Sequence, residues 1–336
     1  MPETSEQMFD MAVVGGGGAG TMAFLRGVLN SNRSVLFAGD ASTLRRARAT
    51  WCPEITEVAA SHGLPAPIEL TSGSALQWIS EQRELRERAT TIASRVTRLE
   101  RDRAGFTLHY GGSRGSERVR ARHVIVATGA IEVHPRINGS RQALLPFAER
   151  GEVLHCASCD GHLAVGRRLS VIGRDDHAMG VVALMVERFC LADVVLLTHG
   201  AEPRLSPEFS LLAQAYGIEP KTSRIVEVLG DPDGEGLQGF RLEDGSRVLA
   251  ERVILALGRV VINQLVTSIG GQVDEDGRVI VNDRFETSIP GLFAVGDVAA
   301  EARVELYSAW DQGLEAADEI NRRLGGTERS VRVAGR

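Results

Sequence analysis

Short apolar runs separated by turn residues open the chain. Residues 11–14 are apolar, a Gly-rich turn follows at 15–20, residues 19–30 have helix character, and a second apolar run covers 34–38. A strand, a tight turn, a helix and a second strand in this order predict one βαβ unit. A less regular region comes next, and the pattern then predicts a helix at 74–89.

Three strand candidates with Gly-containing turns lie within residues 91–127, which predicts a meander. The second half repeats this plan, with a strand at 169–172, a helix at 177–191, a strand at 194–198 and a second meander at 223–258. The segments that close the two halves, ARHVIVATG and AERVILALG, match closely. This internal duplication predicts an α/β fold with two Rossmann-like dinucleotide-binding domains (three-layer ββα), the second inserted into the first.

The insertion predicts three segments along the chain. We expect one domain to be formed by residues 1–125 and 249–336, and the central domain by residues 126–248. Near the C-terminus a helix is expected at about 306–324, followed by a tail that we expect to be mobile.

Composition narrows the class of protein. The length of 336 residues fits about two domains of ordinary size. With 44 acidic against 38 basic residues, the net charge of −6 disfavours a general nucleic-acid surface. No apolar run has the length of a membrane span, and the polar N-terminus lacks the pattern of a secretory signal. The 4 cysteines are too few for a disulfide-stapled secreted scaffold, so we expect a cytoplasmic protein. The charge balance and the short apolar runs lead us to expect no nucleic-acid partner and no membrane.

The first turn carries the glycines of a dinucleotide site. Gly15, Gly17 and Gly20 form G-x-G-x-x-G between a strand and a helix. The first glycine allows the tight turn, the second lets the backbone approach a pyrophosphate, and the third lets helix and strand pack closely. Asp40 stands slightly beyond the place of the ribose-binding acid, so it is either that ligand or a simple turn residue.

A second motif indicates which dinucleotide is bound. The segment TSIPGLFAVGD at 287–297 resembles the second FAD-binding motif of flavoproteins with two dinucleotide domains. The resemblance assigns Gly296 and Asp297 to the flavin ribityl chain, and we place Thr128 and Gly129 at the same cofactor. The alternative is a strand that merely ends in a Gly-Asp turn.

The pair Cys156 and Cys159, followed by Asp160, comes directly before the second βαβ unit. Two thiols at this spacing can close a small disulfide, and a neighbouring acid can move protons as the bond opens and closes. A zinc half-site completed by His155 and His162, or plain core cysteines, are the alternatives. We assign a redox role and no metal site.

These motifs occur in the order found in low-molecular-weight thioredoxin reductases, which the chain resembles from about residue 10 to 325. The resemblance implies FAD, a redox-active disulfide and a homodimer. It makes Cys159 the thiol that faces the flavin, Cys156 the exchange thiol that meets the partner, and Asp160 the general acid/base. Arg303 matches an arginine of the family's C-terminal FAD region.

The second nucleotide motif departs from the family pattern. Asp175 stands where a glycine is expected, and the adjacent Asp176 adds a second carboxylate opposite a phosphate. The His-Arg-Arg run that grips the 2′-phosphate of NADPH is replaced by Leu-Thr-His-Gly, with only Arg204 nearby. NADPH is therefore a doubtful donor, unless neighbouring residues compensate.

Five further residues have two interpretations each. Tyr307 and Trp310 are bulky where the family is small, and they either stack near a flavin or pack in a core or dimer interface. His155 either stabilises the Cys156 thiolate as an imidazolium or is a neutral structural residue. Trp51, with its neighbour Cys52, either lines the flavin or covers a core edge.

The sequence thus predicts a FAD-dependent disulfide oxidoreductase that exchanges electrons with a thioredoxin-like protein or a small dithiol. We favour a form without NADPH, fed by ferredoxin or holding a second FAD. The alternatives are an NADPH-dependent thioredoxin reductase with an atypical donor site, a dithiol oxidase that uses oxygen, and a flavin redox sensor without turnover.

Overall fold

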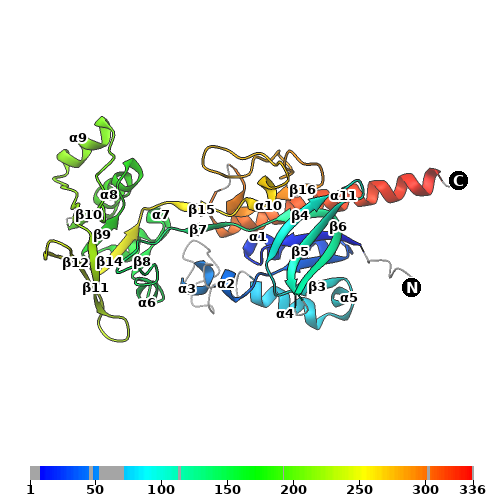
Figure 1. Cartoon of the computed structure of the whole chain (residues 1–336), viewed down its shortest axis with the longest axis horizontal. Coiled ribbons are helices and arrows are strands. Elements are labelled where there is room, and N and C mark those ends of the chain that lie inside the picture. Colours follow the sequence, from blue (N-terminus) through cyan, green and yellow to red (C-terminus); the bar gives the residue numbers. More distant parts are fainter. Residues whose placement is uncertain are drawn as a thin grey trace. The chain divides into compact units, whose positions relative to one another are not determined.

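The computed structural model describes residues 8–44, 48–52, 72–112, 115–191, 193–300 and 303–334. These residues fold into two units, drawn in Figure 1. Unit 2 is Glu132–Val260 together with Trp51 and Cys52, and unit 1 is formed by the described residues on both sides of it. The prediction of an α/β fold with two Rossmann-like units, the second inserted into the first, is confirmed.

The units divide after Ile131 and Val260, whereas the sequence pattern predicted divisions after residues 125 and 248. The later second division has a physical reason, because the strand Arg252–Leu255 pairs with the parallel sheet of unit 2. The paired strands β7 (Ala130–Glu132) and β15 (Arg259–Val261) form the two connections.

Unit 1 is built on a seven-stranded sheet, whose order is β3-β2-β1-β6-β5-β4 with β16 also paired to β6. The strands and helices of this unit are β1 (Phe9–Val14), α1 (Gly18–Leu29), β2 (Ser34–Phe37), α2 (Ala41–Leu44), α3 (Arg48–Trp51, whose last residue belongs to unit 2), α4 (Ser74–Glu81), α5 (Arg83–Arg86), β3 (Ala89–Ile92), β4 (Val96–Arg101), β5 (Phe106–Gly112), β6 (Gly115–Val126), α10 (Gln264–Thr267), β16 (Leu292–Ala294), η3 (Gly296–Val298) and α11 (Leu306–Ala334).

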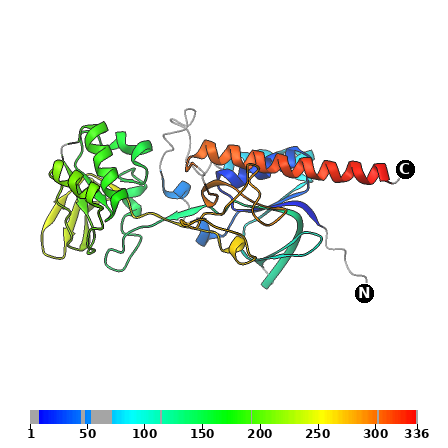
Figure 2. The same cartoon turned by 90° about the horizontal axis from the view of Figure 1, so that it is seen from above.

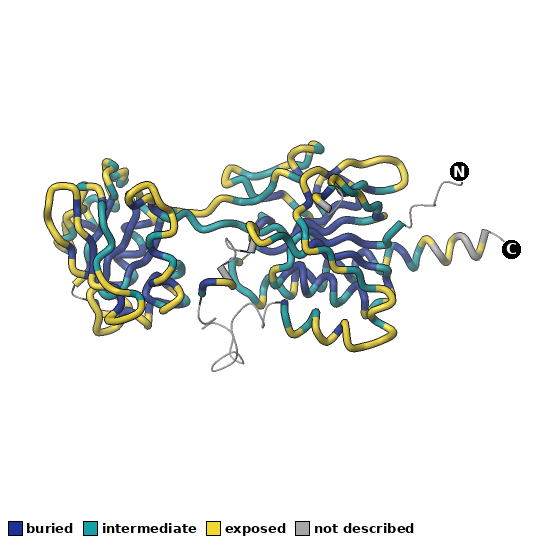
Figure 3. The backbone as a smooth tube through the Cα atoms, turned by 60° about the horizontal axis from the view of Figure 1, so that its bottom comes forward, coloured by how far each residue is buried: buried dark blue, intermediate teal, exposed yellow. Residues whose placement is uncertain are grey.

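The long strand β6 joins two parts of this sheet. Its first half pairs antiparallel with β5 in a meander, and its second half lies between the parallel strands β1 and β16. Side chains of β1 alternate between two cores, because successive residues of a strand point to opposite faces. Met11 and Val13 pack with α1 and α11, and Ala12 and Val14 pack on the meander side. Residues 11–14 of β1 and the last three residues of β6 are accordingly buried, and the central part of the sheet is drawn in dark blue in Figure 3.

Unit 2 repeats the plan with a parallel sheet of order β10-β9-β14-β8 and an antiparallel sheet of order β11-β12-β13. Its elements are α6 (Leu145–Ala148), β8 (Val153–Leu154), α7 (Ala157–Asp160), η2 (Gly161–Ala164), β9 (Leu169–Ile172), α8 (Asp176–Phe189), β10 (Val194–Leu197), α9 (Pro207–Ala215), β11 (Ile225–Asp231), β12 (Gly236–Leu242), β13 (Arg247–Leu249) and β14 (Arg252–Leu255).

Two predicted elements differ from the structure in ways that have local causes. The strand expected over residues 246–258 is two strands, β13 and β14, which belong to different sheets, whereas β6 in unit 1 runs through both parts without a break. The helix expected at 74–89 ends at Glu81, because Gln82 is extended, and α5 and the strand β3 follow.

The C-terminal helix α11 extends to Ala334, further than the expected end near residue 324, and the segment expected to be a mobile tail is helical. Figure 2 shows this helix in orange and red along its whole length. Among the described residues, no helix is both long and apolar enough to cross a membrane.

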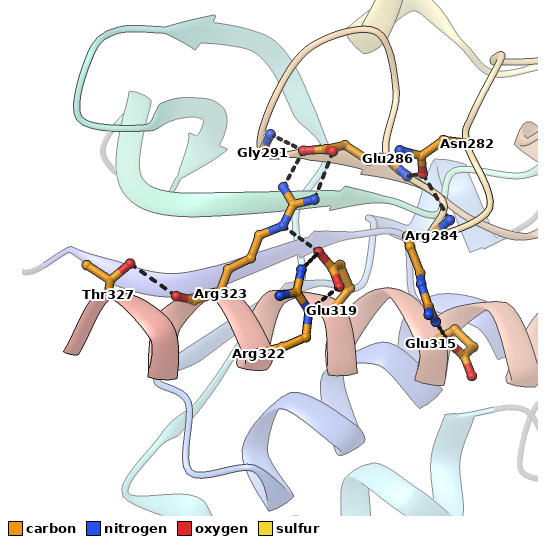
Figure 4. Close-up of polar contacts among 9 residues, drawn as sticks. All are labelled: Asn282, Arg284, Glu286, Gly291, Glu315, Glu319, Arg322, Arg323 and Thr327. Carbon is orange, nitrogen blue, oxygen red and sulfur yellow. Dashed lines mark hydrogen bonds and ion pairs between the residues drawn. The ribbon is translucent and has the colours of Figure 1, made fainter. Parts of the chain in front are cut away.

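A cluster of charges fixes α11 to the segment that leads into β16 (Figure 4). The Arg323 guanidinium donates to both carboxylate oxygens of Glu286 and to Glu319, and it lies 5.3 Å above the Phe293 ring. The Glu286 carboxylate also accepts the Gly291 N–H at 2.8 Å. Hydrogen bonds from Arg322 and then Arg323 lower the pKa of Glu319 to about 2. The cluster thereby ties α11 to Glu286 and to Phe293 of β16.

Candidate functional site

The carboxyl ends of three strands in unit 1 lie in one row. Val14 of β1 pairs with Val126 of β6, which in turn pairs with Ala294 of β16. The residues that follow these strands therefore meet at one edge of the sheet, which is where open α/β sheets bind ligands. They include the Gly-rich turn, Thr128 with Gly129, and Gly296 with Asp297.

Two of the three glycines of the first turn, Gly15 and Gly20, lie where a side chain would collide with the backbone, and the role of Gly17 at a pyrophosphate stays a prediction. Gly15 has a φ of 117°, in the region that favours glycine. A Cβ atom on Gly15 would collide with the carbonyl oxygen of Ala127, and one on Gly20 would collide with the carbonyl oxygen of Gly15. A Cβ on Gly17, by contrast, would meet nothing within 4 Å.

Gly17 is the N-cap of α1, and no side chain caps this helix. The space beside Gly17 is therefore open, and the first N–H groups of α1 carry the partial positive charge of a helix N-terminus. The geometry suits a pyrophosphate that approaches closely, so the residues present fit a dinucleotide such as FAD.

The Gly-Asp turn lies against the same end of α1. Gly296 has a φ of 73°, and a Cβ there would stand 3.0 Å from Cβ of Ala19. Its N–H donates to Oε1 of Gln312 at 2.7 Å, in a buried position. Gln312 was missed in the sequence, because a glutamine inside a helix carries no motif. Asp297 is partly buried in this turn.

Three other predicted cofactor residues have contacts that serve the fold. The Thr128 hydroxyl donates to the Ile262 carbonyl at 2.5 Å, and the Gly129 carbonyl accepts the Ile262 N–H at 3.0 Å. Oδ1 of Asp40 accepts hydrogen bonds from Ser42 and Thr43, and these bonds, led by that of the Ser42 hydroxyl, lower its pKa to about 2.

The hydrogen bonds that Asp40 accepts from Ser42 and Thr43 are those of a turn aspartate. The roles of Thr128, Gly129 and Asp40 at a flavin stay predictions. Arg303 is exposed ahead of α11, and its role at a flavin likewise stays a prediction.

In unit 2 the cysteine pair follows strand β8 at the carboxyl edge of the parallel sheet. Cys156 and Cys159 form a disulfide with Cα atoms 5.3 Å apart. Cys156 is the N-cap of α7, and its Sγ accepts the Cys159 N–H at 3.1 Å. A donor aimed at this sulfur would stabilise negative charge on it after reduction.

The two residues after the pair are packed into unit 2. Asp160 is 7% exposed, and its N–H donates to the Cys156 carbonyl at 2.9 Å. A Cβ on Gly161 would stand 2.8 Å from the Phe189 ring, so only glycine lets this turn approach α8 closely. The backbone of both residues is therefore held within the turn that carries the disulfide.

His155, which precedes Cys156 in the sequence, forms a contact with His134, and the Trp51 ring packs against both histidines. Nε2 of His155 lies 3.3 Å from Nε2 of His134, and the Trp51 ring centroid is 4.7 Å from that of His155 and 5.5 Å from that of His134. Trp51 is buried in unit 2, so it covers a core edge there. Burial, followed by the charge of Arg141, lowers the pKa of His134.

Among the described residues, no group of three or more His, Cys, Asp or Glu side chains is placed to hold a metal ion. The sulfurs of Cys156 and Cys159 are joined to each other.

In the second nucleotide turn, an aspartate side chain caps the helix that follows. Asp175 is the N-cap of α8, and its Oδ1 accepts the Ala178 N–H at 3.1 Å. Oδ1 of Asp176 accepts the Ser206 N–H at 2.7 Å, and the Arg174 carbonyl accepts the Arg204 N–H at 2.6 Å. The N-terminus of α8 is thus capped by a carboxylate, where the N-terminus of α1 has no side-chain cap.

His199, at the end of β10, is tied into the fold as a neutral residue. Its Nδ1 accepts the Ile225 N–H at 3.2 Å, so Nε2 carries the hydrogen and donates to the Arg136 carbonyl at 3.1 Å. Burial is the main cause that lowers its pKa. Both ring nitrogens are occupied, and this histidine presents no charge to a 2′-phosphate.

The repeated α/β fold, the glycine turn before α1 and the disulfide after β8 define the class of protein. The family model of pyridine nucleotide-disulphide oxidoreductases matches residues 9–317, and the chain belongs to this family. The resemblance to thioredoxin reductases read from the sequence is confirmed at this level.

Curated relatives agree with the family. The thioredoxin reductase of Aquifex aeolicus is 27% identical over 339 residues, which cover 97% of this chain and 96% of that enzyme. The thioredoxin reductase of Listeria monocytogenes is 29% identical over 208 residues, which cover 59% of this chain and only 61% of that enzyme. The match to the thioredoxin reductase of Bacillus subtilis, at 27% identity over 213 residues, covers 61% of this chain and 64% of that enzyme.

Solved structures share the fold over almost the whole chain. The crystal structure of HlmI superposes with a TM-score of 0.79 at 25% identity, and covers 100% of this chain and 98% of HlmI. Thioredoxin reductase from Streptococcus pyogenes superposes with a TM-score of 0.78 at 20% identity, with 96% of this chain and 100% of that enzyme covered. The second of these shows the fold alone.

Proposed function

We propose that this protein is a FAD-dependent disulfide oxidoreductase of thioredoxin-reductase type that does not take electrons from NADPH. The observation that carries the proposal is the contrast between two equivalent helix N-termini. Gly17 leaves the N-terminus of α1 open for a pyrophosphate, whereas the Asp175 carboxylate caps the N-terminus of α8. One site fits a dinucleotide, and the other places a negative charge where a phosphate would bind.

Bound FAD would accept and donate the electron pair that the disulfide exchanges. Reduction of the Cys156–Cys159 bond takes two electrons and one proton and leaves one thiol and one thiolate. The Cys159 N–H supports negative charge on Cys156 Sγ, so we assign Cys156 as the thiolate that attacks a partner disulfide. Cys159 then attacks Cys156 Sγ in the mixed disulfide, which restores the internal bond and releases the reduced partner. Asp160 supplies or accepts the proton.

The partner in this proposal is a thioredoxin-like protein or a small dithiol or disulfide. Electrons come from ferredoxin or pass through a second FAD. By the family resemblance the enzyme acts as a homodimer, and the sparse cysteines favour the cytoplasm. Counting the flavins released per chain on denaturation separates the two donor arrangements, because a second FAD predicts two per chain.

One observation favours an NADPH-dependent second candidate. The side chain of Arg224 lies 3.3 Å from where a Cβ on Gly200 would stand, beside His199 at the end of β10. An arginine at this place supplies a cation that the sequence motif lacks. This candidate predicts rapid reduction by NADPH, and our proposal predicts none.

The redox roles are tested by two cysteine variants. Cys156→Ser is expected to leave the Cys159 thiolate beside the flavin and to give a long-wavelength charge-transfer absorbance. Cys159→Ser is expected to give no such band, although it removes the same disulfide. A band in the second variant and none in the first would reverse the two roles, and a band in neither would remove the flavin–disulfide pairing.

A further inference from the structure

The first turns of α11 lie across the first turn of α1. A Cβ atom on Gly18 would collide with Cδ1 of Leu306 and would stand 3.3 Å from Nε1 of Trp310. A Cβ on Gly313 would collide with the carbonyl oxygen of Ala19. Glycines on both helices thus permit this close crossing, and they bring the indole of Trp310 onto the first residue of α1.

The indole nitrogen lies near the N-terminal end of α1. Gly18 is the first residue of α1, and Cα–Cβ bonds in a helix tilt toward its N-terminus, so the Cβ position of Gly18 points toward the N-terminal end of α1. Nε1 is the Trp310 atom that lies nearest to this position. The adjacent Gly17 leaves the space in front of the helix open.

Trp310 brings a hydrogen-bond donor without bringing a charge. Its side chain is partly buried, and among the described residues no hydrogen bond from its N–H is found. An indole N–H is a donor only, and one that is partly buried usually finds an acceptor. The oxygens of a diphosphate are acceptors that match this donor and the first N–H groups of α1.

We propose that Trp310 is a ligand of the dinucleotide diphosphate in unit 1, with its indole N–H donating to a phosphate oxygen. The inference rests on the proposed function, since it takes FAD as the occupant of this site. Gly18 is needed for this contact, because a side chain at Gly18 would displace the Trp310 indole. Trp310 thereby contacts the diphosphate rather than stacking on the flavin ring.

The test uses the full chain freed of flavin and titrated with FAD, with ADP and with adenosine. Trp310→Phe keeps an aromatic ring on Gly18 and removes only the donor. We expect the Kd for FAD and for ADP to rise about tenfold, which corresponds to about 1.4 kcal/mol, and the Kd for adenosine to stay unchanged. Trp78→Phe, at a tryptophan that is 45% exposed on α4, is the matched control and should change none of the three.

The outcomes separate this inference from the function on which it rests. If the wild-type chain does not bind FAD, the proposed function fails. If wild type and Trp310→Phe bind FAD and ADP equally, only the role of Trp310 fails. Equal weakening of ADP and adenosine would also overturn it, because a merely structural or stacking residue affects both ligands.

Discussion

Asp175 offers the sharpest perturbation of the donor site, because its carboxylate both caps α8 and places a negative charge at the helix N-terminus. Asp175→Asn keeps an oxygen that can accept the Ala178 N–H and removes the charge. Asp175→Ala removes the hydrogen bond and the charge together. The pair of variants therefore separates the cap from the electrostatic effect.

Typical energies of helix caps and of charges at helix ends set the size of both effects. Loss of an N-cap side chain costs about 1 kcal/mol, and loss of an acid at a helix N-terminus about 0.3–1 kcal/mol. Asp175→Ala should therefore lower stability by about 1–2 kcal/mol and Tm by roughly 2–6 °C. Asp175→Asn should lose only the smaller part. Thermal and urea unfolding of flavin-loaded protein measure both.

The same charge acts on a bound nucleotide. Two unit charges 4 Å apart repel by about 1 kcal/mol in bulk water and about 4 kcal/mol near a protein surface. Because Asp175 is exposed, we take the lower figure and expect Asp175→Asn to bind NADPH at least about fivefold more tightly than wild type. Glu208→Gln, an exposed acid in the first turn of α9, should leave NADPH binding unchanged.

Nucleotide fluorescence during titration of the oxidised protein measures these affinities. An Asp175→Ala variant as stable as wild type would refute the capping role. An Asp175→Asn variant with unchanged affinity for NADPH would refute the argument that this carboxylate closes the site.

Three more predictions follow from other contacts. Gly17→Ala should lower the stability of the flavin-free fold by no more than about 1 kcal/mol, yet raise the Kd for FAD at least about tenfold. Gly20→Ala should instead destabilise the fold itself, because its Cβ would collide with the Gly15 carbonyl oxygen. Equal urea-unfolding midpoints for the two variants would contradict these glycine roles. Arg323→Ala breaks a partly buried pair with Glu286 and should cost about 2–3 kcal/mol in urea unfolding, against less than about 1 kcal/mol for the exposed Arg322→Ala. Because the pKa of His199 is lowered from 6.5, its stabilisation is present above pH 6.5 and is lost as pH falls through the lowered value; unfolding at pH 7 and pH 5 should show this loss, and His199→Gln should reduce it.

Much of the fold was readable from the sequence because its signals are local. Apolar runs followed by glycines located the strands β1 and β9 and the turns after them, since only glycine tolerates the collisions found at Gly15 and Gly20. The duplication of segments predicted the repeated plan. The bonded cysteine pair was readable from its spacing and its place before a βαβ unit.

The rest depended on tertiary contacts that no local pattern records. Gln312 binds Gly296 from another element, and Gly18 and Gly313 have meaning only once α11 crosses α1. Asp175 was recognised as a departure, yet its capping bond required the helix to be placed. His134 and His155 are 21 residues apart in different segments, so no local pattern predicted that they meet.

The central claim is that the flavin exchanges electrons with the Cys156–Cys159 pair and is closed to NADPH. Anaerobic stopped-flow mixing of the purified, flavin-loaded protein with NADPH, and in a parallel run with a small dithiol, follows the oxidised flavin absorbance directly. We predict that the absorbance persists with NADPH and falls with the dithiol. Rapid bleaching by NADPH would contradict the account.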